Sequence, residues 1–235
     1  DTPVDACLGD LMKLEATTTD YLQQSVPGFD MEAPHYWANK VLTDGVTAAD
    51  LTVNEPALIG WLHTLEAISQ LCMASARYRA AANYARRVLK AEGYPTRAAG
   101  TVLLALARLE DQDGFFALAH QLEEEIGADA LENSPWYLLA RTILLFKTNK
   151  MRPAVRALRE FANRCEGGAF FLLNPMYQTP YLPCRPEPRD PWDLSHQAVW
   201  EADGIISDTP DFAPWANACE DVSQLAQEFA RRYGF

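Results

Sequence analysis

One pattern occurs three times in the middle of the chain, and this repetition restricts the fold more than any other feature of the sequence. Each copy has an apolar helical segment, a short polar turn, an aromatic residue or Met, and an Ala three positions later. The markers and their alanines are Tyr78 and Ala81, Phe116 and Ala119, and Met151 and Ala154. A two-helix unit of roughly 30–40 residues cannot bury its apolar face alone, so neighbouring units stack on it. The sequence therefore predicts an all-α chain of stacked antiparallel helical hairpins.

The residues at helical spacing divide into two sizes with different expected roles. Small residues, such as the three alanines of the second helices, allow the two helices of one hairpin to approach closely. Large residues of the first helices are expected to fill the space between hairpins. The apolar positions of the first helices are Leu65, Ile68 and Cys72, then Leu103, Leu106 and Ala107, then Trp136, Leu139, Ala140 and Ile143.

These residues carry a family resemblance over about residues 60–166. The run of Trp136, Leu139 and Ala140 matches the first helix of a tetratricopeptide repeat, and Tyr78-x-x-Ala81 matches its turn and second helix. The chain thus resembles tetratricopeptide-repeat proteins, although Ser69 replaces the usual Gly or Ala and Pro153 lies in the first turn of a second helix. The resemblance implies a short right-handed solenoid that binds a protein or peptide segment in its concave face.

The segments on either side of the repeats have a different character. We expect an N-terminal helical cap over residues 1–53, the array over 54–168, and a proline-rich loop with C-terminal capping helices over 169–235. Residues 174–192 read NPMYQTPYLPCRPEPRDPW. Since each Pro removes a backbone donor and restricts the residue before it, this stretch predicts an extended loop, and its aromatic residues favour a loop docked on the array over a solvated linker.

Charge and cysteine content narrow the class of protein. The formal net charge of −12 argues against nonspecific binding to nucleic acid and weakly favours a basic partner, although acidity can also serve solubility alone. No apolar run approaches the roughly 20 residues of a membrane span. The five cysteines show no CxxC spacing and predict mostly free thiols. A cytoplasmic location follows as an expectation, although a chain that opens at Asp1 is also compatible with a removed leader.

Residues with catalytic or metal-binding potential form no recognisable motif. His63-x-x-Glu66 and His120-x-x-Glu123 each place an imidazole and a carboxylate one helical turn apart, but at different positions of their repeats. Cys184 lies beside Arg185 without a nearby His to act as base. An enzyme or metal protein that uses the His/Glu pairs remains the alternative to a binding protein. We expect no cofactor and no metal.

The register of the resemblance indicates which residues line the concave face. The expected partner-binding residues are His63, Glu66, Gln70, Thr101, Arg108, Asp111, Tyr137 and Arg141. Arg108 and Arg141 occupy the same repeat position, so together they are predicted to hold a carboxylate of the partner. The alternative is that each Arg pairs with a nearby acid such as Asp111 or Glu110. The function predicted from sequence is thus a non-enzymatic peptide-binding scaffold, and a structural module of a larger assembly is a further possibility.

Overall fold

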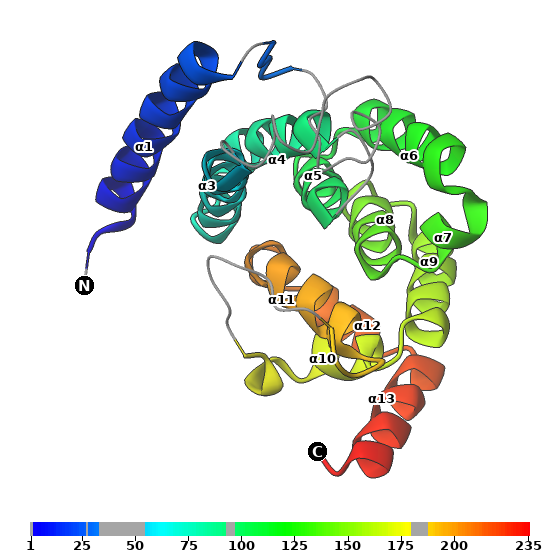
Figure 1. Cartoon of the computed structure of the whole chain (residues 1–235). Coiled ribbons are helices and arrows are strands. Elements are labelled where there is room, and N and C mark those ends of the chain that lie inside the picture. The colour runs from blue at the N-terminus through cyan, green and yellow to red at the C-terminus, as the bar shows by residue number, and fades with distance from the viewer. Residues whose placement is uncertain (1, 27, 33–54, 93–96, 180–187) are drawn as a thin grey trace. The chain divides into compact units, whose positions relative to one another are not determined.

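The computed structural model describes residues 2–26, 28–32, 55–92, 97–179 and 188–235 (Figure 1). Every regular element within these ranges is a helix, which confirms the all-α prediction. The sequence also predicts a short helix from Glu32 to Leu42, a helix N-cap at Asn54 and a helix stop at Gly93; apart from Glu32, these residues lie outside the described ranges.

The described residues form two compact units, which divide inside helix α5 (Arg97–Arg108). The first unit runs to Val102 and the second starts at Leu103. The three segments expected from the sequence remain a prediction. Their first boundary lies outside the described residues, and their second lies within the short helix α10 (Gly168–Leu173).

In the first unit, α1 (Val4–Ser25) packs on α3 (Glu55–Ala74), and α3 packs on α4 (Tyr78–Glu92). Trp61 of α3 is fully buried, and its Nε1 donates a hydrogen bond of 3.0 Å to Oγ1 of Thr19 in α1. The β-branched Thr residues of α1 do not end the helix. Thr17 and Thr18 donate their hydroxyls to backbone carbonyls one turn earlier, which satisfies these hydroxyls inside the helix.

Ser69 explains how α3 and α4 approach closely without the Gly or Ala of the tetratricopeptide pattern. The Ser69 side chain is buried, and its hydroxyl donates a hydrogen bond of 2.9 Å to the carbonyl oxygen of Ala81 in α4. Ala81 is itself fully buried. The small Ser69 side chain therefore fills the contact between α3 and α4, and its buried hydroxyl is not left without a hydrogen bond.

The second unit contains the remaining helices. They are α6 (Gln112–Ile126), α7 (Ala128–Glu132), α8 (Pro135–Lys147), α9 (Met151–Arg164), α10, the 3₁₀ turn η3 (Pro175–Tyr177), α11 (Asp193–Ser207), α12 (Phe212–Asn217) and α13 (Glu220–Tyr233). The sequence also predicts a helix that is capped by Ser134 and has Pro135 at its first position. Helix α8 starts in this way, since Ser134 accepts a hydrogen bond from the N–H of Tyr137 and Pro135 occupies the first turn. It packs on α9, as the third predicted hairpin requires.

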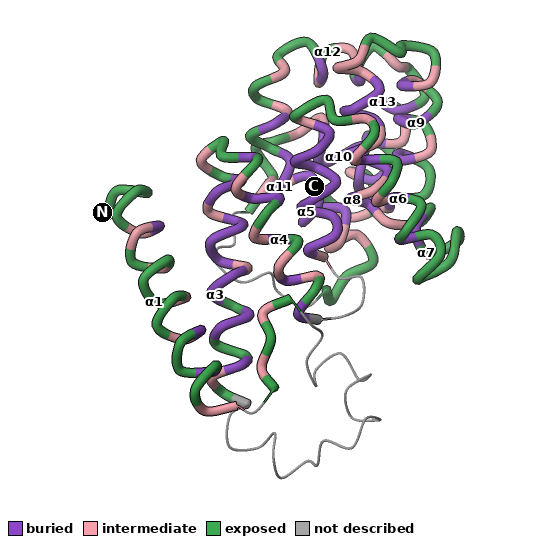
Figure 2. The backbone as a smooth tube through the Cα atoms, turned by 90° about the horizontal axis from the view of Figure 1, so that it is seen from above, coloured by how far each residue is buried: buried purple, intermediate pink, exposed green. Residues whose placement is uncertain are grey.

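The six-residue helix α10 is a centre of packing in the second unit. It contacts α9, α11, α12 and α13, and Figure 2 shows it as an almost wholly buried segment. Gly167, with φ of +76°, turns the chain into this helix, and a side chain at this position would collide with Phe229. The sequence also predicts that the Gly167-Gly168 pair ends the array. Helix α9 ends before this pair, at Arg164, and the pair starts a buried helix that the sequence showed only as a short apolar run.

One position of the predicted register is wrong by a single residue. Phe116 is 44% exposed, whereas Phe115 is fully buried and stacks on Tyr137 with ring centroids 6.1 Å apart. The buried row of α6 consists of Phe115, Ala119 and Leu122, a spacing of four and then three residues. Ala119 thus occupies its predicted interior position, and the aromatic residue one full turn before it faces the interior with it.

The described ends of the proline-rich segment pack against the second unit. Near its start, the N–H of Thr179 donates to Nε2 of His196 at 3.1 Å, and the Tyr177 ring contacts Phe170. The segment is not wholly extended, since it includes the 3₁₀ turn η3. Near its end, Asp193 accepts hydrogen bonds from the N–H groups of residues 189 and 190, so this carboxylate orders the preceding loop. From sequence we also expect Asp193 to cap the following helix, whereas the structure has Trp192 at the N-cap position of α11 and Asp193 in its first turn.

Candidate functional site

The expected concave-face residues of the first unit lie on one side of α3 and differ widely in exposure. His63 is exposed, and Glu66 is partly buried. Gln70 is only 6% exposed, and its Oε1 has no hydrogen-bond donor among the described groups. Thr101, on α5, is buried. Of this set, only His63 and Glu66 offer polar groups to a partner.

In the second unit, Arg108 and Asp111 already make contacts within the chain. Arg108 Nη2 lies 3.4 Å from Oδ2 of Asp208, the residue that follows α11. Asp111 caps α6, because its side chain accepts a hydrogen bond of 2.9 Å from the N–H of Gly114. Both side chains therefore stabilise the fold of this unit.

Arg141 is likewise held by its neighbours on α8 and α9. Its guanidinium forms an ion pair with Glu160 and lies over the Tyr137 ring, with Cζ 5.5 Å from the ring centroid. Burial alone would lower the pKa of Arg141, but hydrogen bonding and charge interactions with Tyr137 and Glu160 raise it. This guanidinium is charged and partly removed from solvent.

The interpretation of Arg108 and Arg141 as a joint carboxylate clamp is therefore corrected. Each guanidinium has its own acid within the second unit, as the alternative interpretation from sequence required. The acids are Asp208 and Glu160, whereas the sequence suggested Asp111 and Glu110. Glu110 pairs with Lys147 instead, at 3.2 Å. Physically, carboxylates from adjacent helices were closer to the guanidiniums than those of the following turn.

The residues of the metal-enzyme alternative are not brought together. His120 lies 3.6 Å from Glu124 rather than near Glu123, and both side chains are largely exposed. Among the described residues, no group of three or more His, Cys, Asp and Glu side chains is arranged to hold a metal ion.

The cysteines of the described ranges are free thiols, namely Cys7, Cys72, Cys165 and Cys219, as the sequence predicted for most of them. Burial raises the pKa of the Cys165 thiol to about 12, and burial also raises the pKa of Cys72. A thiol that remains protonated is a poor nucleophile. Cys184, the loop cysteine, lies outside the described residues.

Two further exposed residues of α3 were not identified as candidate binding residues from the sequence. Ile59 is 37% exposed one turn before His63, and Gly60 is exposed beside it. Among the described residues, no atom lies within 4 Å of a Cβ built on Gly60, so they leave the space above it open. Spacing alone could have found Ile59, which precedes His63 by four positions and Glu66 by seven. Its exposure could not be inferred, because an Ile on an apolar helix is usually buried.

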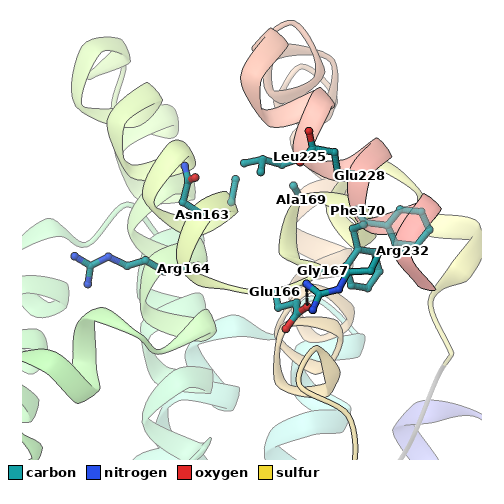
Figure 3. Close-up of a pocket in the computed structure, with 11 residues that line it drawn as sticks. Asn163, Arg164, Glu166, Gly167, Ala169, Phe170, Leu225, Glu228 and Arg232 are labelled. Carbon is teal, nitrogen blue, oxygen red and sulfur yellow. Dashed lines mark hydrogen bonds and ion pairs between the residues drawn. The ribbon is translucent and has the colours of Figure 1, made fainter. Parts of the chain in front are cut away.

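A pocket of about 450 Å³ lies in the second unit, between the end of α9, the start of α10 and α13 (Figure 3). Its polar side is closed by Glu166, which accepts hydrogen bonds from Arg232 at 3.0 Å and from the Tyr233 hydroxyl at 2.6 Å. Its apolar side includes Leu225 and Phe229. Since its strongest polar group already has two donors, this pocket joins α13 to the unit and presents no set of convergent reactive groups.

His196 contacts both an aromatic ring and the backbone at the start of the proline-rich segment. Its ring meets Phe171 edge to face at 4.7 Å, and its Nε2 accepts the hydrogen bond from Thr179. Burial lowers the pKa of His196, and the nearby Asp193 charge opposes this shift. An accepting Nε2 requires the neutral ring with its proton on Nδ1. His196 therefore anchors the proline-rich segment only while it is uncharged.

No protein-family model matches the chain, and the comparisons with curated proteins and with solved structures found no match. Among the described helices, none combines the length and the apolar character required to cross a membrane.

Proposed function

We propose that this chain is a non-enzymatic helical-hairpin scaffold that binds a protein or peptide segment. The tetratricopeptide-like register of the hairpins, a right-handed solenoid, is part of this proposal. The observation that carries it is the position of α11, which packs on α8 while the residue after it contacts Arg108. The residue that follows this helix thus contacts Arg108, one of the residues that the sequence had assigned to a partner.

The contact between α8 and α11 combines the two elements of helix recognition. The buried Trp136 indole donates a hydrogen bond of 2.8 Å to Glu201 of α11. Around this bond α11 supplies buried apolar side chains, among them Val199 and Ala202. Apolar anchors with a few placed polar contacts are typical of a helix bound in a groove. The first helix of a hairpin in this chain therefore has the surface chemistry that receives another helix.

The corresponding first helix in the other unit, α3, retains an exposed row. This row consists of Ile59, Gly60, His63 and Glu66. We define it as the α3 row and propose it as the partner-binding surface. Gly60 permits close approach of a second backbone, Ile59 supplies an apolar contact, and Glu66 favours a basic or hydrogen-bond-donating side chain.

A site-specific crosslinking experiment tests this function. A photoreactive amino acid replaces His63 in the α3 row, and a matched variant carries it at Asn83, an exposed residue of α4. After irradiation in extract from the native source, we expect a discrete protein adduct at position 63 and none at position 83. The His63 adduct should disappear when Gly60→Leu blocks the approach. Equal labelling at both positions, or adducts that survive Gly60→Leu, would contradict the proposal.

The metal-enzyme alternative has a simple measurement of its own. Protein purified without added metal is assayed for metal content by mass spectrometry. A stoichiometric metal that is lost in His63→Ala or His120→Ala would support that alternative and contradict a purely binding role.

A further inference from the structure

A hollow on the outer side of α9, in the second unit, combines positive charge with an apolar floor. It is an open groove of about 680 Å³, lined by Met151, Arg152, Val155, Arg156 and Arg159. Residues 151, 155 and 159 are four positions apart, as are 152 and 156, so these two adjacent rows of side chains lie on one face of the helix. We call this surface the α9 groove.

Two of the three arginines of the α9 groove form no ion pair with a described carboxylate. Arg159 is held by Asp221 of α13, with Nε 2.6 Å from Oδ2. Arg152 and Arg156 are exposed, and neither forms an ion pair within the described part of the chain. They are one helical turn apart, which corresponds to a rise of about 6 Å along the axis. Two guanidiniums with available donors thus lie beside a third that is fixed in place.

This local charge is opposite to that of the whole molecule. The chain has 32 acidic and 20 basic residues. Of the three arginines of the groove, Arg159 alone is paired with a carboxylate within the described residues. Arg152 and Arg156 therefore form a cationic site within an acidic protein, and a ligand that fits it must present negative charge at short range.

The apolar floor decides which anionic ligand fits. Met151 is 36% exposed and Val155 is partly exposed, so the groove also offers contact to an apolar side chain. Met adapts its shape readily to different apolar groups. A nucleic-acid backbone supplies no apolar side chain, and its many phosphates are repelled by the net charge of −12. An acidic peptide supplies both components.

We infer that the α9 groove binds an acidic peptide segment in which an apolar residue stands between two carboxylates. In an extended peptide, alternate residues are separated by about 6–7 Å, which matches the spacing of Arg152 and Arg156. Each guanidinium then receives one carboxylate in a bidentate contact, and the apolar residue between them lies on Met151 and Val155. This surface is on a different helix and in a different unit from the α3 row, so it is an additional site.

The test uses fluorescence anisotropy with a labelled peptide that carries Glu-Leu-Glu triplets between Gly-Ser spacers. We expect saturable binding that weakens with salt, and about a tenfold loss of affinity in the double variant Arg152→Ser/Arg156→Ser. The matched control is Arg79→Ser/Arg86→Ser, which removes the same charge from the exposed face of α4 and should leave affinity unchanged. Circular dichroism confirms that both variants remain folded.

Peptide variants separate the two contributions of the groove. Replacing each Glu by Gln should abolish binding, and replacing Leu by Ser should weaken it, as should Val155→Asp in the protein. The inference is overturned if the original peptide does not bind, if both Arg double variants lose affinity equally, or if a single-stranded oligonucleotide binds as tightly as the peptide. The crosslinking result at His63 is independent of all these outcomes.

Discussion

The hydrogen bond between Trp136 and Glu201 provides a quantitative test of how α11 is attached to α8. Trp136 is 3% exposed, and Trp136→Phe removes its N–H while retaining most of the apolar side chain. A hydrogen bond to a carboxylate typically contributes about 1.5–3 kcal/mol, so we expect a destabilisation in that range. Trp136→Ala also leaves a cavity and should destabilise the protein by about 3–5 kcal/mol.

Urea unfolding followed by far-ultraviolet circular dichroism measures both effects, since helical signal does not depend on the removed indole. If the two units unfold separately, the relevant transition is the one that Leu158→Ala shifts, because Leu158 is fully buried in the second unit. A double-mutant cycle with Glu201→Leu, which removes the accepting oxygens, isolates the hydrogen bond from the change in packing; Glu201→Gln, whose amide oxygen can still accept, removes only the contribution of the charge. The coupling free energy should be about 1 kcal/mol or more.

Two results would refute this reasoning. A Trp136→Phe variant within about 0.5 kcal/mol of the parent, with no coupling to Glu201→Leu, would mean that the hydrogen bond does not stabilise the contact. A Trp136→Ala variant no less stable than Trp136→Phe would mean that the indole is not a buried part of the core.

The remaining predictions concern two glycines and a histidine. Gly60→Ala should raise the free energy of unfolding by about 0.5–1 kcal/mol, because Gly60 is helical and the described residues leave space for a Cβ. Gly114→Ala should lower the free energy of unfolding, because the new Cβ would lie 2.6 Å from Asp111 Oδ2. Thermal melts of the two variants distinguish these outcomes. The pKa of His196 is lower in the folded state than its ordinary value of 6.5, so between these two pH values the unfolded state binds more protons. The neutral His196 ring therefore contributes fully to stability above pH 6.5, and this contribution is lost as the pH falls through the folded-state pKa. The stability difference between the parent and His196→Gln should therefore shrink on acidification in urea titrations at a series of pH values, and a constant difference would show that His196 does not titrate differently on folding.

Local patterns were sufficient to predict the helical class and one complete helix start. Ser134 and Pro135 gave the start of α8 because capping depends on residues within one turn. The interior alanines, including Ala81 and Ala154, were identified correctly because close helix packing requires small residues at a fixed spacing. Such features depend on neighbours in the chain, so the sequence carries them directly.

Contacts across long sequence separations could not be predicted in the same way. The partner of Trp136 is Glu201, and the partner of Arg108 is Asp208, each far along the chain. The sequence predicted α11 as a helix after the proline-rich stretch but gave no indication of the surface that receives it. Consequently the acids suggested from sequence, Asp111 and Glu110, were those that closely follow Arg108, whereas the structure pairs Arg108 with Asp208 and Arg141 with Glu160.

The same comparison explains why the α9 groove was not recognised in the sequence. Its arginines alternate with the buried positions Ala154, Ala157 and Leu158, a pattern that any amphipathic surface helix shows. The distinction arises only when the ion pairs are known. Arg164 of the same helix is paired with Glu132 at 3.0 Å, and Arg159 is paired across to α13, whereas Arg152 and Arg156 remain exposed in a hollow. Within the part of the chain that the structure describes, Arg152 and Arg156 therefore combine exposed guanidiniums without an ion pair and an adjacent apolar surface, in a chain where acids outnumber bases.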